Sequence, residues 1–153
     1  MPSGRGVDVH LYAESSAVLA WMLGDDGGAD AAEALAAAEG VVASDLTVVE
    51  CERVLIRAWA TGILSEAASA DQRATLAAAV ARWVRLKVDE EVIERARRSF
   101  PVEPVRTLDA LHLASALVAR AALPGLAVLT LDQRIRGNAE RLGFETLPRS
   151  FAV

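Results

Sequence analysis

Short apolar segments rich in β-branched residues alternate along this chain with longer segments of helical character, and this alternation constrains the fold more than any other feature. We expect strands at residues 7–12, 41–44, 85–88, 126–131 and 144–147. We expect helices at residues 17–22, 30–39, 46–61, 90–100, 107–121 and 132–142, with one or two more within 65–85. Strands separated by helices predict an α/β fold with a mostly parallel sheet covered on both faces. Ligands of such sheets bind beyond the carboxyl ends of the strands.

Polar residues and glycines near the helix ends are expected to set where the helices begin and stop. A serine of the pair Ser15–Ser16 is expected to cap the first helix, and Thr107 is expected to cap the long apolar helix near residue 107. Gly62 follows the helix at 46–61 in a position that favours termination.

The length of 153 residues suits one domain that spans residues 1–153. The only cysteine, Cys51, has no partner for an intrachain disulfide, which favours a reducing cytoplasm. The first residues lack the apolar core of a signal peptide. The apolar stretch at 110–131 contains His112, Arg120 and the turn pair Pro124–Gly125, so two buried elements explain it better than a membrane span. We therefore expect a cytoplasmic protein without a membrane-spanning helix.

The formal net charge of −5 and the isoelectric point near 5.1 limit the role that nucleic acid can play. An acidic surface argues against broad, sequence-blind attraction to nucleic acid. A nucleic-acid substrate at a metal-loaded site remains compatible with this charge, because a bound cation reverses the local sign.

Four acidic side chains stand where a parallel sheet would gather them. Glu14 and Asp132 each follow an expected strand and precede a helix, so both project from the same end of the sheet. Asp109 lies in the first turn of an otherwise apolar helix, and Glu50 lies on the helix after the second strand. A buried carboxylate such as Asp109 needs a partner or neutralisation.

Each of these acids also has a purely structural explanation. Asp132 could cap a helix, Asp109 could favour its helix dipole, and Glu14 could accept backbone hydrogen bonds at a turn. Glu50 could be a solvated residue beside Arg53 and Arg57. Glu52 competes with Glu50 as the second acid, and the helical wheel alone does not decide between them.

Carboxylates brought within about 4 Å of one another would repel by roughly 4 kcal/mol per pair at an effective dielectric of about 20, and a divalent cation would relieve that repulsion. A shell of oxygen ligands selects hard cations such as Mg²⁺ or Mn²⁺. The two histidines, His10 and His112, do not form a zinc pattern with Cys51. The pattern therefore indicates a Mg²⁺ or Mn²⁺ site, not a zinc site.

Several motifs resemble those of PIN domains, in the correct order and over nearly the whole chain. The segment 11–17 (LYAESSA) resembles their opening strand and turn, and 44–53 (SDLTVVECER) resembles their second acidic motif. The segment 108–116 (LDALHLASA) is the most specific match, to the third motif, and 128–132 (VLTLD) resembles the fourth. Residues 142–144 (LGF), followed by Pro148, resemble the usual ending.

The size and motif set are most similar to VapC-type toxins of bacterial toxin–antitoxin pairs. This resemblance implies a PIN-like three-layer α/β/α domain, a Mg²⁺-dependent endoribonuclease, a homodimer and a small antitoxin partner. It assigns the catalytic and metal-binding acids to four positions, which also resolves the tie with Glu52: Glu14, Glu50, Asp109 and Asp132. Glu14 departs from the family, whose first acid is aspartate. One extra methylene lengthens its reach by about 1.5 Å, and misplacements of that order can cost roughly a hundredfold in rate.

The hypothesis that follows is metal-assisted hydrolysis of RNA phosphodiesters. Ser15 and Thr130 are candidates for supporting a ligand carboxylate or the substrate phosphate, although capping and strand roles explain them as well. Arg53, Arg57 and Arg106 are candidates for gripping phosphates, with solvated surface positions as the alternative. His112 is expected to be a satisfied core or interface histidine, with a general acid as the alternative.

Other interpretations remain beside that hypothesis. A PIN domain weakened by Glu14 could bind RNA or an antitoxin without efficient cleavage. A phosphatase-like α/β domain would need a strand-end aspartate with a second acid two residues later, which the segment 14–16 does not supply. The tryptophans at 21, 59 and 83 are expected on helices and in the core, with a dimer or antitoxin face as the alternative.

Overall fold

A computed structural model describes residues 9–149 of the chain, so Val7 and Asp8 of the expected first strand lie outside the described residues. The elements follow in the order β1 (His10–Ala13), α1 (Ser15–Leu23), α2 (Gly28–Ala37), β2 (Gly40–Ser44), α3 (Asp45–Ala60), α4 (Glu66–Val80), β3 (Val84–Leu86), α5 (Glu90–Ala96), α6 (Thr107–Ala122), β4 (Ala127–Leu129), α7 (Gln133–Arg141) and β5 (Thr146–Leu147). The expected alternation of strands and helices is confirmed.

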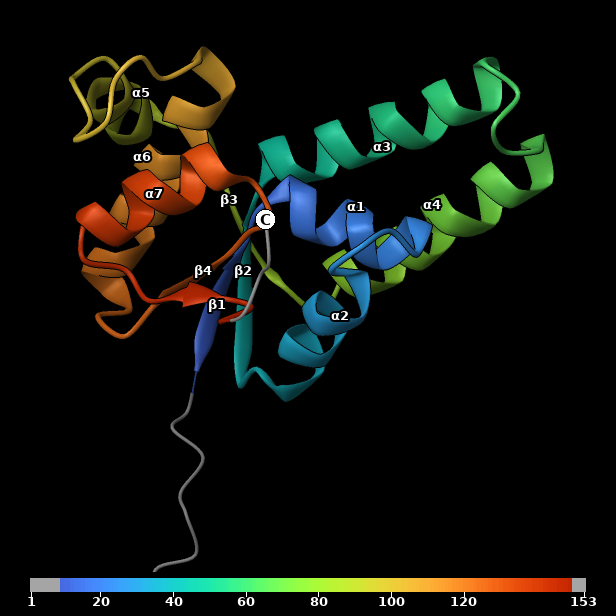
Figure 1. The fold of residues 1–153 in the computed structure, drawn as a ribbon, viewed down its shortest axis with the longest axis horizontal. Coiled ribbons are helices and arrows are strands. Elements are labelled where there is room, and N and C mark those ends of the chain that lie inside the picture. Colours follow the sequence, from blue (N-terminus) through green and yellow to red (C-terminus); the bar gives the residue numbers. More distant parts are fainter. Residues whose placement is uncertain (1–8, 150–153) are drawn as a thin grey trace, which may run out of the picture.

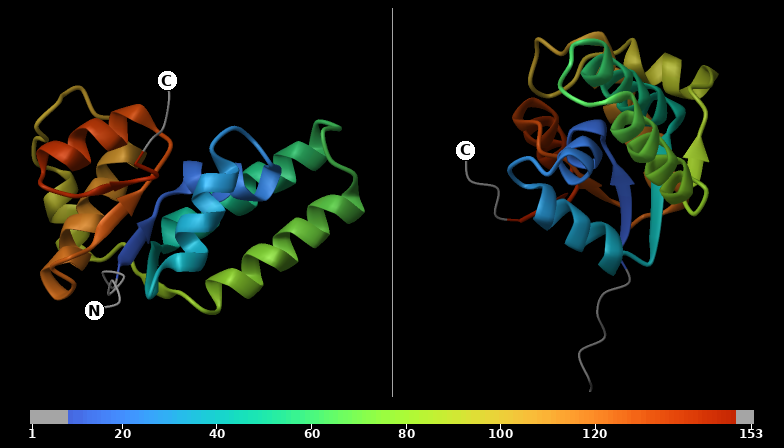
Figure 2. Two further views of the ribbon diagram at one scale, coloured as in Figure 1. Left: turned by 60° about the horizontal axis from the view of Figure 1, so that its bottom comes forward. Right: turned by 90° about the vertical axis from the view of Figure 1, so that its right-hand side faces the viewer.

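The five strands form one sheet in the order β3-β2-β1-β4-β5, and all four pairings are parallel. Helices α1 to α4 lie on one side of the sheet and α5 to α7 on the other (Figures 1 and 2). The predicted three-layer architecture is therefore confirmed. The chain places β2 and β3 on one side of β1 and then returns to place β4 and β5 on the other side. The strand order thus reverses between β1 and β4, which is where open α/β sheets bind ligands.

Side chains alternate between the two faces of the sheet, as a buried parallel strand requires. On β1, Tyr12 packs in the cluster with α6 and α7, which includes Leu113 and Ile135. Leu11 and Ala13 face the opposite layer, where the core also receives residues of α1, α2, α3 and α4. Within residues 9–149, no helix combines the length and the apolar character needed to cross a bilayer.

Several element ends differ from the sequence-based expectation because local hydrogen bonds compete with the periodic pattern. Helix α1 is capped by the carboxylate of Glu14, which accepts from the backbone of Ser16, and not by a serine. The N-cap of α6 is Arg106, without a side-chain cap, so the expectation for Thr107 was wrong. Helix α5 ends at Ala96 and is followed by a loop that the carboxylate of Glu103 holds together, because it accepts from two backbone N–H groups.

The tryptophans only partly follow the expectation. Trp21 lies on α1 and packs against the core, as expected. Trp59 lies on α3 but is 44% exposed, and Trp83 lies in the turn before β3 and not on a helix. The periodicity that places a residue on a helix does not decide which face the rest of the fold covers.

Candidate active site

The four acidic residues singled out from the sequence line one cavity of about 460 Å³: Glu14, Glu50, Asp109 and Asp132. Glu14 directly follows β1 and Asp132 follows β4, so both lie at the carboxyl ends of the two strands between which the strand order reverses. Helix α3, which directly follows β2, supplies Glu50, and the first turn of α6 supplies Asp109. Four distant chain segments therefore deliver carboxylates to one hollow.

Glu14 is nearly fully buried, with 4% of its surface exposed. Its Oε2 accepts from the backbone N of Ser16 at 2.8 Å, from the Ser16 hydroxyl at 2.5 Å and from the Thr130 hydroxyl at 3.1 Å. Burial raises the pKa of Glu14, and the nearby His112 and the hydrogen bonds from Ser16 and Thr130 act in the opposite direction. The carboxylate is therefore oriented by three donors in a site that disfavours its charge.

Glu50 is the end of a hydrogen-bonded chain that passes through His112 to Tyr12. The His112 Nε2 lies 2.5 Å from Glu50 Oε1, and the Tyr12 hydroxyl lies 2.8 Å from His112 Nδ1. Burial, together with the charge of Glu14, raises the pKa of Tyr12, so its phenol keeps its proton. Either the Tyr12 hydroxyl or Nδ1 can be the donor of their hydrogen bond, because the direction depends on the tautomer of His112. Nε2 donates to the carboxylate of Glu50, which can only accept.

The same carboxylate receives a second hydrogen bond, from the Ser15 hydroxyl at 2.9 Å. Partial burial acts to raise the pKa of Glu50, but the hydrogen bond and charge of His112 and the bond from Ser15 outweigh it, so the pKa is lowered. Glu50 is thus held as an anion at the edge of the pocket. Glu52 is exposed and lines a different hollow, beside Trp83 and Arg85.

The other two acids have partners of a different kind. Asp109 Oδ2 lies 3.3 Å from the Nε of Arg106, one turn earlier. Asp132 caps α7, because its Oδ1 accepts from the backbone N of Arg134 and Ile135 at 2.9 and 3.1 Å. The capping role that the sequence left open for Asp132 is therefore real, and it coexists with a position in the pocket.

The donor set fits a hard divalent cation in its chemistry, because the titratable side chains of the pocket are carboxylates and the arginine Arg106. A cation would also offset the cost of burying the charge of Glu14. The side chains as placed do not form a ready-made cage: within residues 9–149, no three histidine, cysteine or acidic side chains converge in a way that could hold a metal ion. Metal binding would compete with the Arg106 contact of Asp109 and with the helix cap that Asp132 forms.

The sequence reasoning missed two hydroxyls and one cation that organise the pocket. Ser16 binds Glu14 and also accepts from the backbone N of Leu131 at 2.9 Å, which ties the first turn of α1 to the segment that follows β4. Arg136 is 9% exposed and donates to the Thr130 carbonyl at 2.8 Å from behind the pocket. The role of Tyr12 could have been suspected, because it stands two residues before Glu14 and therefore shares its face of an extended strand.

Known proteins resemble this chain in sequence and in fold. A sequence model of the family described as PIN domain matches residues 11–140. Ribonuclease VapC35 of Mycobacterium tuberculosis is 33% identical over 92 residues, which make up 55% of this chain and 67% of that protein.

Two solved structures share the fold. VapC20 of Mycobacterium tuberculosis, described as a Sarcin-Ricin loop cleaving toxin, has a TM-score of 0.60 at 17% identity and covers 88% of this chain and 95% of its own. VapBC2 from Rickettsia felis, solved bound to a DNA fragment from its promoter, has a TM-score of 0.59 at 10% identity, covering 90% of this chain and 96% of its own. At such identities these structures support the fold alone, and the expected PIN-like fold is confirmed.

Proposed function

This chain belongs to the PIN domain family and is a homologue of VapC-type toxin ribonucleases, and on that premise we propose that it is a Mg²⁺-dependent endoribonuclease that acts as the toxin of a toxin–antitoxin pair. The observation that carries the proposal is the single pocket lined by four carboxylates from four separate segments. Mn²⁺ would serve as an alternative cation, because it accepts the same oxygen ligands.

In this proposal the catalytic acids are also the metal ligands, with Glu14, Asp109 and Asp132 holding the cation and Glu50 acting as a ligand or as the group that orients the attacking water. A cation bound there would lower the pKa of that water and would neutralise negative charge on the phosphate. Glu50 suits the orienting role because His112 and Ser15 fix its Oε1 and lower its pKa.

The supporting roles fall to groups around the acids. Thr130 and Ser16 fix the direction of Glu14, so that its longer side chain is oriented by donors at both the β1 and the β4 end. Arg106, whose side chain is 66% exposed, lies at the mouth of the pocket and suits an RNA phosphate. An arriving phosphate would compete with Asp109 for this guanidinium and so release the carboxylate.

A second candidate function is binding of RNA or an antitoxin without efficient cleavage. Two observations favour it: Glu14 stands where the family has aspartate and is already occupied by three donors, and no three acids among the described residues converge on a metal position. This second function is compatible with the same fold and the same pocket, so only an assay of RNA cleavage separates the two candidates.

The test is to incubate the protein with a labelled structured RNA in Mg²⁺, in Mn²⁺ and in EDTA. We expect cleavage that needs the metal and that falls at least a hundredfold in Asp109→Asn. Asp71→Asn on α4 is the matched control, because Asp71 is exposed and outside the pocket, and it should cleave like the wild type. RNA binding without cleavage in either metal would select the binding function instead.

We also propose a cytoplasmic homodimer of this single domain, residues 1–153, neutralised by a small antitoxin. Support for the antitoxin comes from the relatedness to VapC-type proteins, one of which was solved in a VapBC complex. Light scattering on the purified protein tests the dimer. The antitoxin is tested by looking for a short open reading frame upstream of the gene and asking whether the protein that it encodes co-purifies with this chain after co-expression.

A further inference from the structure

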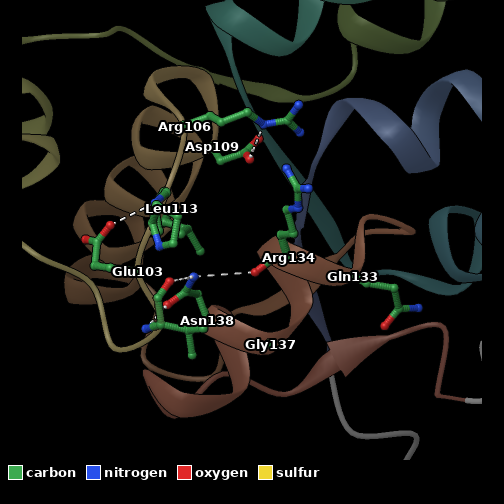
Figure 3. A pocket seen from close by; sticks show the side chains of 11 residues that line it. Glu103, Arg106, Asp109, Leu113, Gln133, Arg134, Gly137 and Asn138 are labelled. Atoms are coloured by element: carbon green, nitrogen blue, oxygen red, sulfur yellow. Dashed lines mark hydrogen bonds and ion pairs between the residues drawn. The ribbon is translucent and has the colours of Figure 1, made fainter.

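A larger cavity, of about 560 Å³, opens directly beside the acidic pocket and shares Arg106 and Asp109 with it. Figure 3 shows this cavity between the loop before α6, the start of α6 and one side of α7. We propose that it is a subsite for one unstacked base of a single-stranded RNA whose phosphate lies at the acids. This inference rests on the proposed function, because it assigns the substrate of the same site.

The walls of the cavity suit a flat, largely apolar ring. Its apolar lining comes from Val102, Pro104 and Val105 of the loop, Leu113 of α6 and the backbone of Gly137 on α7. A volume of this size lies within the range of about 300–1,000 Å³ that is usual for small-molecule pockets. Sequence-specific RNA recognition typically takes bases that have left the stack and inserts them into such pockets.

The loop wall is already held in place before any ligand arrives. Asn138 of α7 accepts from the backbone N of Val102 at 2.9 Å and donates to the Val102 carbonyl at 3.1 Å. Glu103 accepts from the backbone N of Phe100 and of Val105, both at 2.8 Å, so its two oxygens are used inside the loop. A preformed wall lowers the ordering cost of binding.

The charges at the rim favour a nucleotide over an uncharged ligand. Arg106 and Arg134 approach the cavity from α6 and α7, and Figure 3 shows the Arg134 side chain directed across it toward the Arg106–Asp109 pair. Arginine binds phosphate through its fork of N–H donors and stacks on bases through its plane. On a chain of net charge −5, these two cations are placed where a phosphate between the two hollows would lie.

Gly137 offers a direct way to fill the cavity. A Cβ placed on Gly137 would meet no atom within 4 Å, and its φ is not positive, so a side chain can leave the backbone there without a clash at Cβ. Leucine also suits a helix better than glycine, so the variant should fold. Gly125 is the matched control, because a Cβ there also meets nothing within 4 Å and the residue lies in the turn between α6 and β4, outside the cavity lining.

The first experiment measures binding in EDTA, so that no RNA is cut. ¹⁵N-labelled protein is titrated with AMP, CMP, GMP and UMP, and fluorescence anisotropy follows a labelled single-stranded RNA of ten nucleotides. We expect at least one mononucleotide to shift the amides of the cavity residues, and the RNA to bind at least tenfold more tightly than that mononucleotide. Gly137→Leu should weaken both by about 10- to 100-fold, the range that reading one base is worth, whereas Gly125→Leu should stay within twofold.

Three outcomes overturn the subsite: no mononucleotide perturbs the cavity, Gly137→Leu binds like the wild type, or a mononucleotide binds as tightly as the RNA, which would make the cavity a free-nucleotide site. A cleavage assay in Mg²⁺ keeps this failure separate from that of the proposed function. If the wild type does not cleave RNA but Gly137→Leu loses RNA binding, the nuclease function is refuted and the subsite is supported. If the wild type cleaves RNA and Gly137→Leu changes neither cleavage nor binding, the nuclease function is supported and the subsite is refuted.

Discussion

Replacing Tyr12 with phenylalanine removes one hydroxyl from a place that water does not reach. Tyr12 is 1% exposed and His112 is 2% exposed, and the Tyr12 hydroxyl is hydrogen-bonded to Nδ1 of His112 at 2.8 Å. Without that hydroxyl, Nδ1 is a buried polar atom with no partner, which costs about 1–3 kcal/mol. For a domain of this size, each kcal/mol lowers Tm by roughly 2–4 °C, so Tyr12→Phe should lower Tm by about 2–12 °C.

A double-mutant cycle isolates this interaction, with Tyr12→Phe, His112→Leu and the double variant compared by urea unfolding. The double variant leaves no orphaned nitrogen. The sum of the two losses of unfolding free energy in the single variants should therefore exceed the loss in the double variant by about 1–3 kcal/mol. His112→Leu should also raise the pKa of Glu50, because the hydrogen bond and charge that lower it are gone. Site-specific ¹³C NMR of the carboxyl group measures that pKa.

Two results would refute this reasoning. Unfolding of Tyr12→Phe within about 0.5 kcal/mol of the wild type would mean that the hydroxyl does not satisfy His112, since changes of that size are typical of surface substitutions. An additive cycle would mean that the two residues stabilise the fold independently, and that Tyr12 does not help to position Glu50 through His112.

Other predictions concern the groups around the pocket. Arg136→Met should destabilise the protein by about 1.5–3 kcal/mol in urea, because the Thr130 carbonyl loses a charged donor, whereas Arg134→Met, exposed on the same helix, should stay within about 0.5 kcal/mol. Burial raises the pKa of Cys51 to about 12, so folded protein should resist alkylation by iodoacetamide at pH 8.5 and react only when unfolded. Because the folded pKa is the higher one, the stability linked to this thiol is complete below its unfolded pKa and is lost as the pH rises toward 12, and prompt alkylation at pH 8.5 would contradict its burial. Mg²⁺ at a hundredfold excess over its Kd should stabilise the fold by about 2.7 kcal/mol relative to NaCl of equal ionic strength, and Asp109→Asn should abolish the rise in Tm; an equal rise in the variant would exclude the pocket as the metal site.

The order of strands and helices could be predicted from the sequence because it depends on local periodicity. Runs such as Val41–Ser44 and the apolar helix that begins at Thr107 carry their pattern within a few residues, and the structure has both. The element ends were less predictable, because side chains and loops compete for the terminal N–H groups. Helix α1 is capped by Glu14, and α5 stops at Ala96, four residues before the expected end at Phe100.

The sequence by itself determined that strand-end acids would gather at one end of a parallel sheet, because strand direction and alternation settle that without knowledge of packing. Only the tertiary structure decided how those acids are held. Tyr12 and His112 are 100 residues apart, and His112 and Glu50 are 62 apart, yet the packing of α6 on the sheet joins all three by hydrogen bonds. The same packing places Glu50 in the pocket and leaves Glu52 exposed. Contacts between distant segments depend on how whole layers pack, and local periodicity carries no information about that packing.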